Sequence, residues 1–173
     1  RRQIFRGQWI RHGGYYPKQL LKLFRRNCVY FDDSELVDHH FYVPGPTERL
    51  RHDIVEDNAK ENDLAFWINK HCRYAALMAQ EEDQRRNRRA ESVSGPPLKA
   101  ELFGSPDQRS LWFKGLWSRL PLYVRAWLYF LYRYVFRLGF LDGRQGLIFH
   151  FLHACWFRFL VDIYLDELRQ RKS

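Results

Sequence analysis

The sequence predicts an α+β protein with a strand-rich first part, a packing helix and a C-terminal pair of apolar helices. Three observations predict this fold class. Short β-prone runs separated by glycine and proline turns occupy residues 1–55, and apolar residues recur at helical spacing over residues 58–88. Two longer apolar segments then fill most of residues 120–165.

The first 55 residues alternate between short apolar or aromatic runs and turn-forming groups. The runs include residues 27–31 and 41–43, and the turns include Gly13-Gly14 and Pro44-Gly45-Pro46. Runs of this length, bounded by glycine and proline, are typical of strands and loops at the edge of a mixed sheet. We therefore predict short strands in this region.

Residues 58–88 predict one amphipathic helix that packs with one face. Its apolar stripe at three-and-four spacing consists of Leu64, Trp67, Ile68, His71, Tyr74, Ala75 and Met78. The periodicity ends in the charged run 81–89, and Ser94-Gly95-Pro96-Pro97 follows. The predicted regions are therefore a domain part over residues 1–91, a linker over 92–109 and a helical hairpin over 110–173.

Residues 120–140 and 146–165 predict two helices joined by the turn-forming segment 141–145. In the first helix Arg125, Arg133 and Arg137 fall within about a third of the helix circumference, and aromatic and leucine side chains dominate the rest. One basic strip on an otherwise apolar helix suits a membrane interface, where guanidinium groups meet lipid phosphates. We expect this helix to lie in such an interface.

The second apolar segment is nearly long enough to cross a bilayer, which takes about 20 mostly apolar residues. Arg158 and Asp162 oppose a full span, since a charge at mid-bilayer costs about 3 kcal/mol. A monotopic or re-entrant hairpin is the predicted arrangement, and the core of a soluble helical bundle is the alternative. His150 and His153 are interpreted as interfacial polar tips, or alternatively as ligands or a proton relay. The residues predicted at the membrane interface are Arg125, Trp127, Arg133, Arg137, Trp156 and Arg158.

Charge and composition narrow the class of partner. The net charge of +9 over 173 residues favours an anionic partner, which is nucleic acid, anionic lipid or a phosphorylated substrate. Aromatic residues make up 17% of the chain and crowd beside arginines between residues 111 and 164, a mixture typical of a membrane surface. No RRM signature or zinc finger occurs, so nucleic acid is not an expected partner. The three cysteines form no C-x-x-C pair, which argues against a zinc ribbon and a disulfide framework.

Polar motifs suited to chemistry lie mainly in the first part of the chain. In the loop His12-Gly13-Gly14-Tyr15-Tyr16-Pro17, paired glycines allow the backbone to approach a ligand closely, and two tyrosines offer faces that stack on a sugar. The blocks that follow in order are Leu23-Phe24-Arg25-Arg26, Asp38-His39-His40-Phe41, Pro44-Gly45-Pro46 and the helical run over residues 66–75.

In this order the blocks resemble the later half of family 2 glycosyltransferases of the bacterial cell-surface polysaccharide and lipopolysaccharide type. That half typically has a glycine-glycine-aromatic-tyrosine-proline loop, a leucine-phenylalanine-arginine strand, a histidine-acid segment and a lysine-histidine-asparagine-arginine-tyrosine helix. Residues 138–150 also resemble the membrane-proximal end of that group. The resemblance implies part of a GT-A-type mixed sheet, and transfer of a sugar from a nucleotide-sugar donor to a lipid-linked or polysaccharide acceptor of the cell envelope. It places the protein at the cytoplasmic face of the plasma membrane.

The resemblance also implies that the chain is a fragment. Family members bind the nucleotide sugar and a divalent metal, Mg or Mn, through an acidic motif in the N-terminal half, and no Asp-x-Asp occurs here. We therefore expect no metal ligands within this chain, and expect the chain alone to be inactive.

The resemblance also implies roles for single residues, which follow from their positions in the matching motifs. The expected catalytic base is Asp38, His39 or His40, although relatives commonly have a glutamate where this chain has His39. The expected substrate-binding residues on the acceptor side are His12, Gly13, Gly14, Tyr15, Tyr16, Arg25 and Arg26.

The alternative function is a membrane-surface binding module without chemistry, which binds liposomes but releases no nucleotide from a sugar donor.

Overall fold

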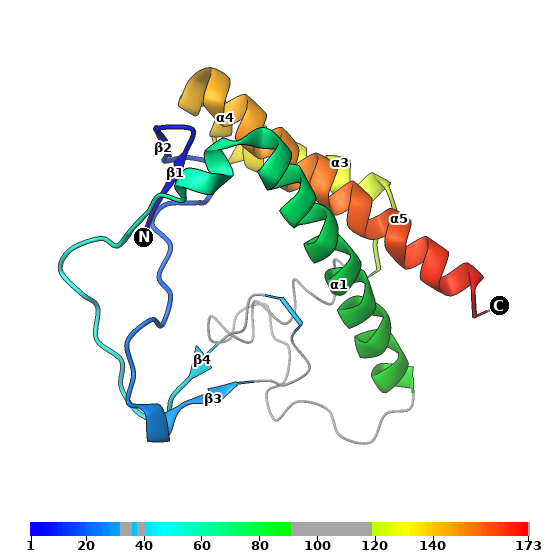
Figure 1. The fold of residues 1–173 in the computed structure, drawn as a ribbon, viewed down its shortest axis with the longest axis horizontal. Coiled ribbons are helices and arrows are strands. Elements are labelled where there is room, and N and C mark those ends of the chain that lie inside the picture. The colour runs from blue at the N-terminus through cyan, green and yellow to red at the C-terminus, as the bar shows by residue number, and fades with distance from the viewer. Residues whose placement is uncertain (32–35, 38–40, 91–118, 173) are drawn as a thin grey trace.

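The computed structural model describes residues 1–31, 36–37, 41–90 and 119–172. Its frame is a pair of long helices, α1 (Leu64–Ala90) and α5 (Phe157–Gln170), with a small sheet near the end at which both helices start (Figure 1). The two helices run in the same direction, because Trp67 near the start of α1 contacts Trp156, and Asp83 further along α1 forms an ion pair with Lys172. Strands and helices are both present, as the predicted α+β class requires.

The sheet has three short strands in the order β2-β1-β5. Strands β1 (Arg2–Phe5) and β2 (Gln8–Ile10) form an antiparallel hairpin, and β5 (Val55–Glu56) pairs with β1 in parallel. Arg6 and Gly7 at the hairpin turn both have positive φ, of 49° and 78°, which matches the twist that two-residue hairpins prefer. A small mixed sheet was expected in this region, and its membership of a GT-A sheet remains a prediction.

Two further strands lie apart from this sheet. Strands β3 (Tyr30–Phe31) and β4 (Phe41–Tyr42) form a separate antiparallel pair, preceded by the 3₁₀ turn η1 (Arg26–Cys28). Figure 1 shows this pair well below β1 and β2, near the lower edge of the view.

Helix α1 begins later than its apolar pattern predicts. The 3₁₀ turn η2 (Ala59–Asn62) comes first, and Asp63 then accepts hydrogen bonds from the backbone N–H groups of Ala65 (2.7 Å) and Phe66 (3.1 Å). These bonds satisfy N–H groups that have no partner within the helix, so Asp63 fixes the start of α1.

The C-terminal region is a helical hairpin, as predicted. Its first arm is α3 (Val124–Leu131), which continues as the π-helical turn η3 (Tyr132–Phe136). The second arm consists of η4 (Gly139–Asp142), α4 (Gly143–His150), the π-helical segment η5 (Phe151–Trp156) and α5. The chain reverses at Leu138, whose φ of 59° is left-handed, and not at residues 141–145, which already belong to the second arm.

Two hydrophobic clusters hold these elements together. Ala75 and Ala79 of α1 pack against Phe157, Val161 and Leu165 of α5, and the small alanine side chains allow the two helices to approach closely. The second cluster joins the sheet to α1 and α4 and consists of Phe5, Ile10, Trp67 and Phe149. The hairpin therefore shares its core with both the sheet and α1.

Within the described residues, the second arm is the one helix that could cross a membrane by length and composition. It spans Gly139–Gln170, or 32 residues, and 44% of its most apolar window is buried inside the protein. A core helix of a soluble protein passes the same test, so this observation establishes a long apolar helix and nothing finer.

Candidate functional site

The loop over residues 12–16 is fixed to the reversal of the helical hairpin. The backbone N–H of Gly13 donates to the Arg137 carbonyl (2.8 Å), and Nε of Arg133 donates to the Gly13 carbonyl (2.7 Å). Gly13 has a φ of +66°, and a Cβ atom there would lie 2.0 Å from Cε1 of His150. The paired glycines predicted a close approach of the backbone to a ligand. In the structure Gly13 instead lies close to the buried His150, and Gly14 is exposed.

Asp142 holds His12 at the base of this loop. Its buried carboxylate accepts the backbone N–H groups of Arg11 (3.1 Å) and His12 (2.9 Å), and its other oxygen lies 2.7 Å from Nδ1 of His12. The Asp142 carbonyl also accepts a hydrogen bond from Gln8 (2.7 Å). Sequence reasoning treated Asp142 only as a turn former, because its partners lie about 130 residues earlier in the chain.

The two tyrosines of the loop have different surroundings. Tyr15 packs against Phe149, with ring centroids 4.6 Å apart, and the guanidinium of Arg133 lies 3.9 Å from its ring centroid. Burial raises the pKa of Tyr15 to about 12, although Arg133 opposes the rise, so its hydroxyl stays protonated at neutral pH. Tyr16 instead donates to Asp53 (3.1 Å). The Asp53 carboxylate has a lowered pKa because it accepts a hydrogen bond from Arg2 and another from Tyr16.

The other predicted site residues are not brought to this loop. Arg25 and Arg26 are exposed, and Arg26 lies in the 3₁₀ turn η1 instead of the expected strand, close to β3 and remote from β1 and α4 (Figure 1). Asp38, His39 and His40 lie outside the described residues.

Arg125 does not belong to an exposed basic strip, which corrects its predicted position at the membrane interface. Its side chain is 1% exposed and donates from Nε to Asp162 (2.6 Å) on α5. Its two terminal nitrogens donate to both carboxylate oxygens of Glu82 on α1, at 2.8 and 3.1 Å. Asp162 also accepts the backbone N–H of Tyr123 (2.7 Å). Arg125 is therefore a buried junction of three helices, and its charge is balanced inside the protein.

Arg133 and Arg158 have a different environment on the same hairpin. Both guanidinium groups lie against Tyr129 of α3, at 5.3 and 5.6 Å from its ring centroid, and Arg133 also donates to the Tyr129 hydroxyl. Burial alone would raise the pKa of Tyr129, but the positive charges of Arg133 and Arg158, with Lys18, reverse the effect and lower it. The surroundings of Tyr129 are therefore strongly electropositive.

Twelve large apolar side chains are exposed along the first arm and the start of the second. We call this set the apolar face; its members are 42–76% exposed. The first seven follow the spacing i, i+3, i+4, i+7, i+8, i+11, i+12, which places them on one side of α3 and η3. The apolar face consists of Val124, Trp127, Leu128, Leu131, Tyr132, Val135, Phe136, Leu138, Phe140, Leu141, Leu147 and Phe151.

The aromatic residues predicted at a membrane interface divide between surface and core. Trp127 is part of the apolar face, whereas Trp156 is half-buried and packs against Trp67 and both hydrophobic clusters. Arg137 is exposed next to the apolar face, as an interfacial arginine would be. Trp156 is thus part of the packing that joins α1 to the second arm.

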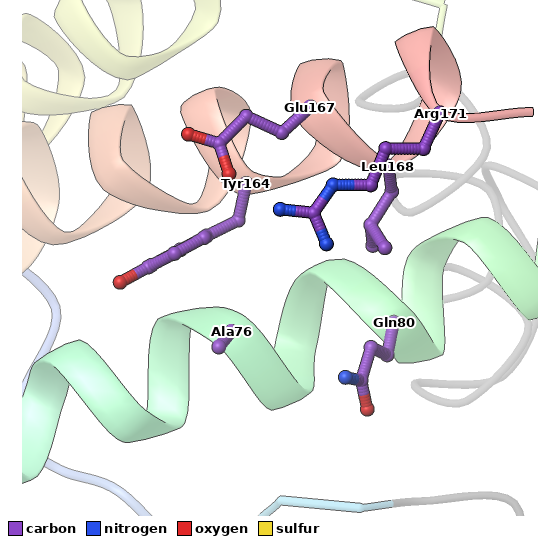
Figure 2. A pocket seen from close by; sticks show the side chains of 6 residues that line it. All are labelled: Ala76, Gln80, Tyr164, Glu167, Leu168 and Arg171. Carbon is purple, nitrogen blue, oxygen red and sulfur yellow. The ribbon is translucent and has the colours of Figure 1, made fainter.

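A separate pocket lies between α1 and α5, away from the loop. Figure 2 shows Tyr164 and Glu167 of α5, with Arg171 just after its end, above Ala76 and Gln80 of α1. None of the predicted site residues lines it. In the part of the chain that the structure describes, no group of three or more His, Cys, Asp or Glu side chains could hold a metal ion.

No family model, curated protein or solved structure matches this chain.

Proposed function

We propose that this chain is the membrane-docking, acceptor-side part of a family 2-like glycosyltransferase. In this proposal a sugar passes from a nucleotide-sugar donor to a lipid-linked or cell-envelope acceptor at the cytoplasmic face of the membrane. One observation carries the proposal: the loop over residues 12–16, which resembles the family's acceptor loop, is bonded to the same hairpin that presents the apolar face.

The apolar face supports the membrane part of the proposal. Seven of these side chains lie on one side of α3 and η3, and large exposed apolar surfaces on soluble proteins mark membrane or protein contacts. Phe136 is 76% exposed, and burying one such side chain in lipid is worth about 1.5–3 kcal/mol. The net charge of +9 and the exposed Arg137 favour an anionic membrane over another apolar surface.

The ion pairs of the hairpin support a position on the membrane instead of across it. Asp162 lies on the second arm and is bonded to Arg125, and Arg125 is bonded to Glu82 on α1. A spanning second arm would take this charged group, together with α1, into hydrocarbon, where charges are costly. A hairpin that lies flat buries only the apolar face and leaves the charged group inside the protein.

The chemical part of the proposal rests on the motif order. The donor nucleotide sugar and the Mg or Mn ion would be bound by residues outside this chain, and Asp38, His39 and His40 are the proposed bases. His12 and Tyr15, which the hairpin holds in place, would contact the acceptor.

Membrane docking is tested by flotation of the protein with vesicles of phosphatidylethanolamine and phosphatidylglycerol. The double substitution Leu131→Ser and Phe136→Ser on the apolar face is expected to reduce the bound fraction at least tenfold, because two buried apolar side chains are lost. Leu23→Ser is the matched control, since Leu23 is 80% exposed but precedes Phe24, which packs on Phe41 of β4, outside the hairpin. Equal binding by the double variant and the control would refute the docking surface.

Sugar transfer is tested on the protein encoded by the complete reading frame that contains this chain. We expect release of nucleoside diphosphate from a nucleotide sugar when bacterial membrane lipids are added, and loss of release when Asp38, His39 and His40 are replaced together by alanine. Membrane binding without any nucleotide release would favour the alternative function, a binding module without chemistry.

A further inference from the structure

Two arginines from opposite arms of the hairpin meet at one tyrosine. Arg133 comes from the first arm and Arg158 from the second, and each guanidinium carbon lies within 6 Å of the Tyr129 ring centroid. Arg133 is fixed in place because it also donates to the Gly13 carbonyl (2.7 Å) and covers the Tyr15 ring. The hairpin thus holds two positive charges beside Tyr129, and one of them, Arg133, contacts the residue 12–16 loop.

These two charges have no carboxylate partner among the described residues. Arg125, about two helical turns before Arg133, is bonded to Asp162 and Glu82, whereas neither Arg133 nor Arg158 forms an ion pair in the described part of the chain. Arg158 also makes no hydrogen bond there, although a guanidinium has five N–H donors. Two half-buried guanidinium groups with unused donors form a site for an anion.

The position of the two arginines selects the kind of anion. Arg133 follows Tyr132 of the apolar face by one residue, so its charge lies at the border of that face. On the other side, Arg133 contacts Tyr15 of the acceptor loop. An anion bound here would have lipid on one side and the sugar-accepting loop on the other.

We propose that Arg133 and Arg158 bind the phosphate of a lipid phosphate, whose hydrocarbon chain lies along the apolar face and whose head reaches the residue 12–16 loop. A planar guanidinium suits this ligand because it can donate two parallel hydrogen bonds to phosphate oxygens, as Arg158 could. Arg133, whose Nε and Nη1 already donate to Gly13 and Tyr129, would add a donor from Nη2. Binding of the phosphate follows from the two arginines alone; its role as the sugar acceptor rests on the proposed function.

The test measures binding of farnesyl phosphate to the full chain docked on phosphatidylcholine vesicles, followed by tryptophan fluorescence. Arg158→Gln is the main variant, because Arg158 has no hydrogen-bond partner in the described protein and its loss should leave the fold intact. We expect at least a tenfold loss of farnesyl phosphate affinity in this variant, since hydrogen bonds to charged groups are among the strong ones. Arg144→Gln is the matched control, because Arg144 is exposed at the start of α4 and outside the site.

Two further ligands test whether the site recognises the phosphate group or the hydrocarbon chain. Farnesol should bind weakly and equally to the native protein and to Arg158→Gln, and inorganic phosphate at millimolar concentration should compete with farnesyl phosphate. Unchanged farnesyl phosphate affinity in Arg158→Gln would overturn the site. Binding of farnesyl phosphate that phosphatidylglycerol vesicles abolish completely would show a site for bulk headgroups, and would overturn the lipid-phosphate assignment.

The outcome is independent of the test of sugar transfer. If Arg158→Gln loses farnesyl phosphate but the complete protein releases no nucleotide, the phosphate site stands and the glycosyltransferase proposal fails. If nucleotide is released and Arg158→Gln has native KM for the lipid acceptor, the enzyme stands and this site fails.

Discussion

Replacing Arg125 by methionine is expected to destabilise the protein strongly without weakening its binding to anionic vesicles. The substitution removes the partner of Asp162, whose side chain is 1% exposed, and leaves that carboxylate with only the Tyr123 N–H among its described donors. Removing one member of a buried ion pair costs about 3–5 kcal/mol. This is a large part of the 5–15 kcal/mol by which a typical domain is stable.

The assay is urea unfolding followed by tryptophan fluorescence, with vesicle flotation of the same samples. The control Arg144→Met removes an exposed arginine and should change the free energy of unfolding by less than about 0.5 kcal/mol. Adding Asp162→Asn to Arg125→Met should recover part of the loss, because the buried Asp162 charge that lost its guanidinium partner is then removed. A variant with native stability but reduced vesicle binding would refute the reasoning, since it would show Arg125 at the lipid surface.

Three further predictions concern the loop and its anchors. Gly13→Ala should lower the free energy of unfolding in urea by about 1–3 kcal/mol more than Gly7→Ala does. Both glycines have positive φ, but of the two only Gly13 would place a Cβ against His150. Equal losses of stability in the two variants would contradict this packing. Burial lowers the pKa of His150 in the folded protein to about 4. As the pH falls, the His150 imidazole is therefore protonated near pH 6.5 in the unfolded chain but only near pH 4 in the folded protein. Stability should therefore fall by about 3 kcal/mol as the pH drops from 6.5 to 4, and an NMR titration in which the His150 imidazole protonates near pH 6.5 would exclude this. Asp142→Asn should speed amide hydrogen exchange at His12, because a neutral amide is the weaker acceptor; unchanged exchange would show that the carboxylate charge is not needed.

The helices were predictable because their signals are local. The apolar stripe from Leu64 to Met78 predicted α1, and only the cap at Asp63 moved its start. The hairpin followed from two apolar segments, but its reversal was placed too late. Asp142-Gly143 is a strong turn signal in sequence, whereas the actual reversal uses a left-handed leucine, Leu138, which carries no such signal.

The site was predictable only as a list of candidate residues. The loop over residues 12–16 was found from its glycines and tyrosines, but its anchors Arg133 and Asp142 lie 120 and 130 residues away, where no local pattern connects them. On a helical wheel Arg125 and Arg133 fall on the same strip. Their roles differ because Glu82 and Asp162, on other helices, reach one of them and not the other.

This difference explains how one helix serves both the core and a surface. The side of α3 and η3 that carries Arg125, Tyr129 and Arg133 faces the rest of the protein, and the side with Phe136 faces outward. Along the inner side, carboxylates balance the positive charge of Arg125 at the start of the arm. At its end, next to the loop, Arg133 has no carboxylate partner among the described residues. The first arm therefore supports the core at its start, and the proposed anion site lies at its end, between the apolar face and Tyr15.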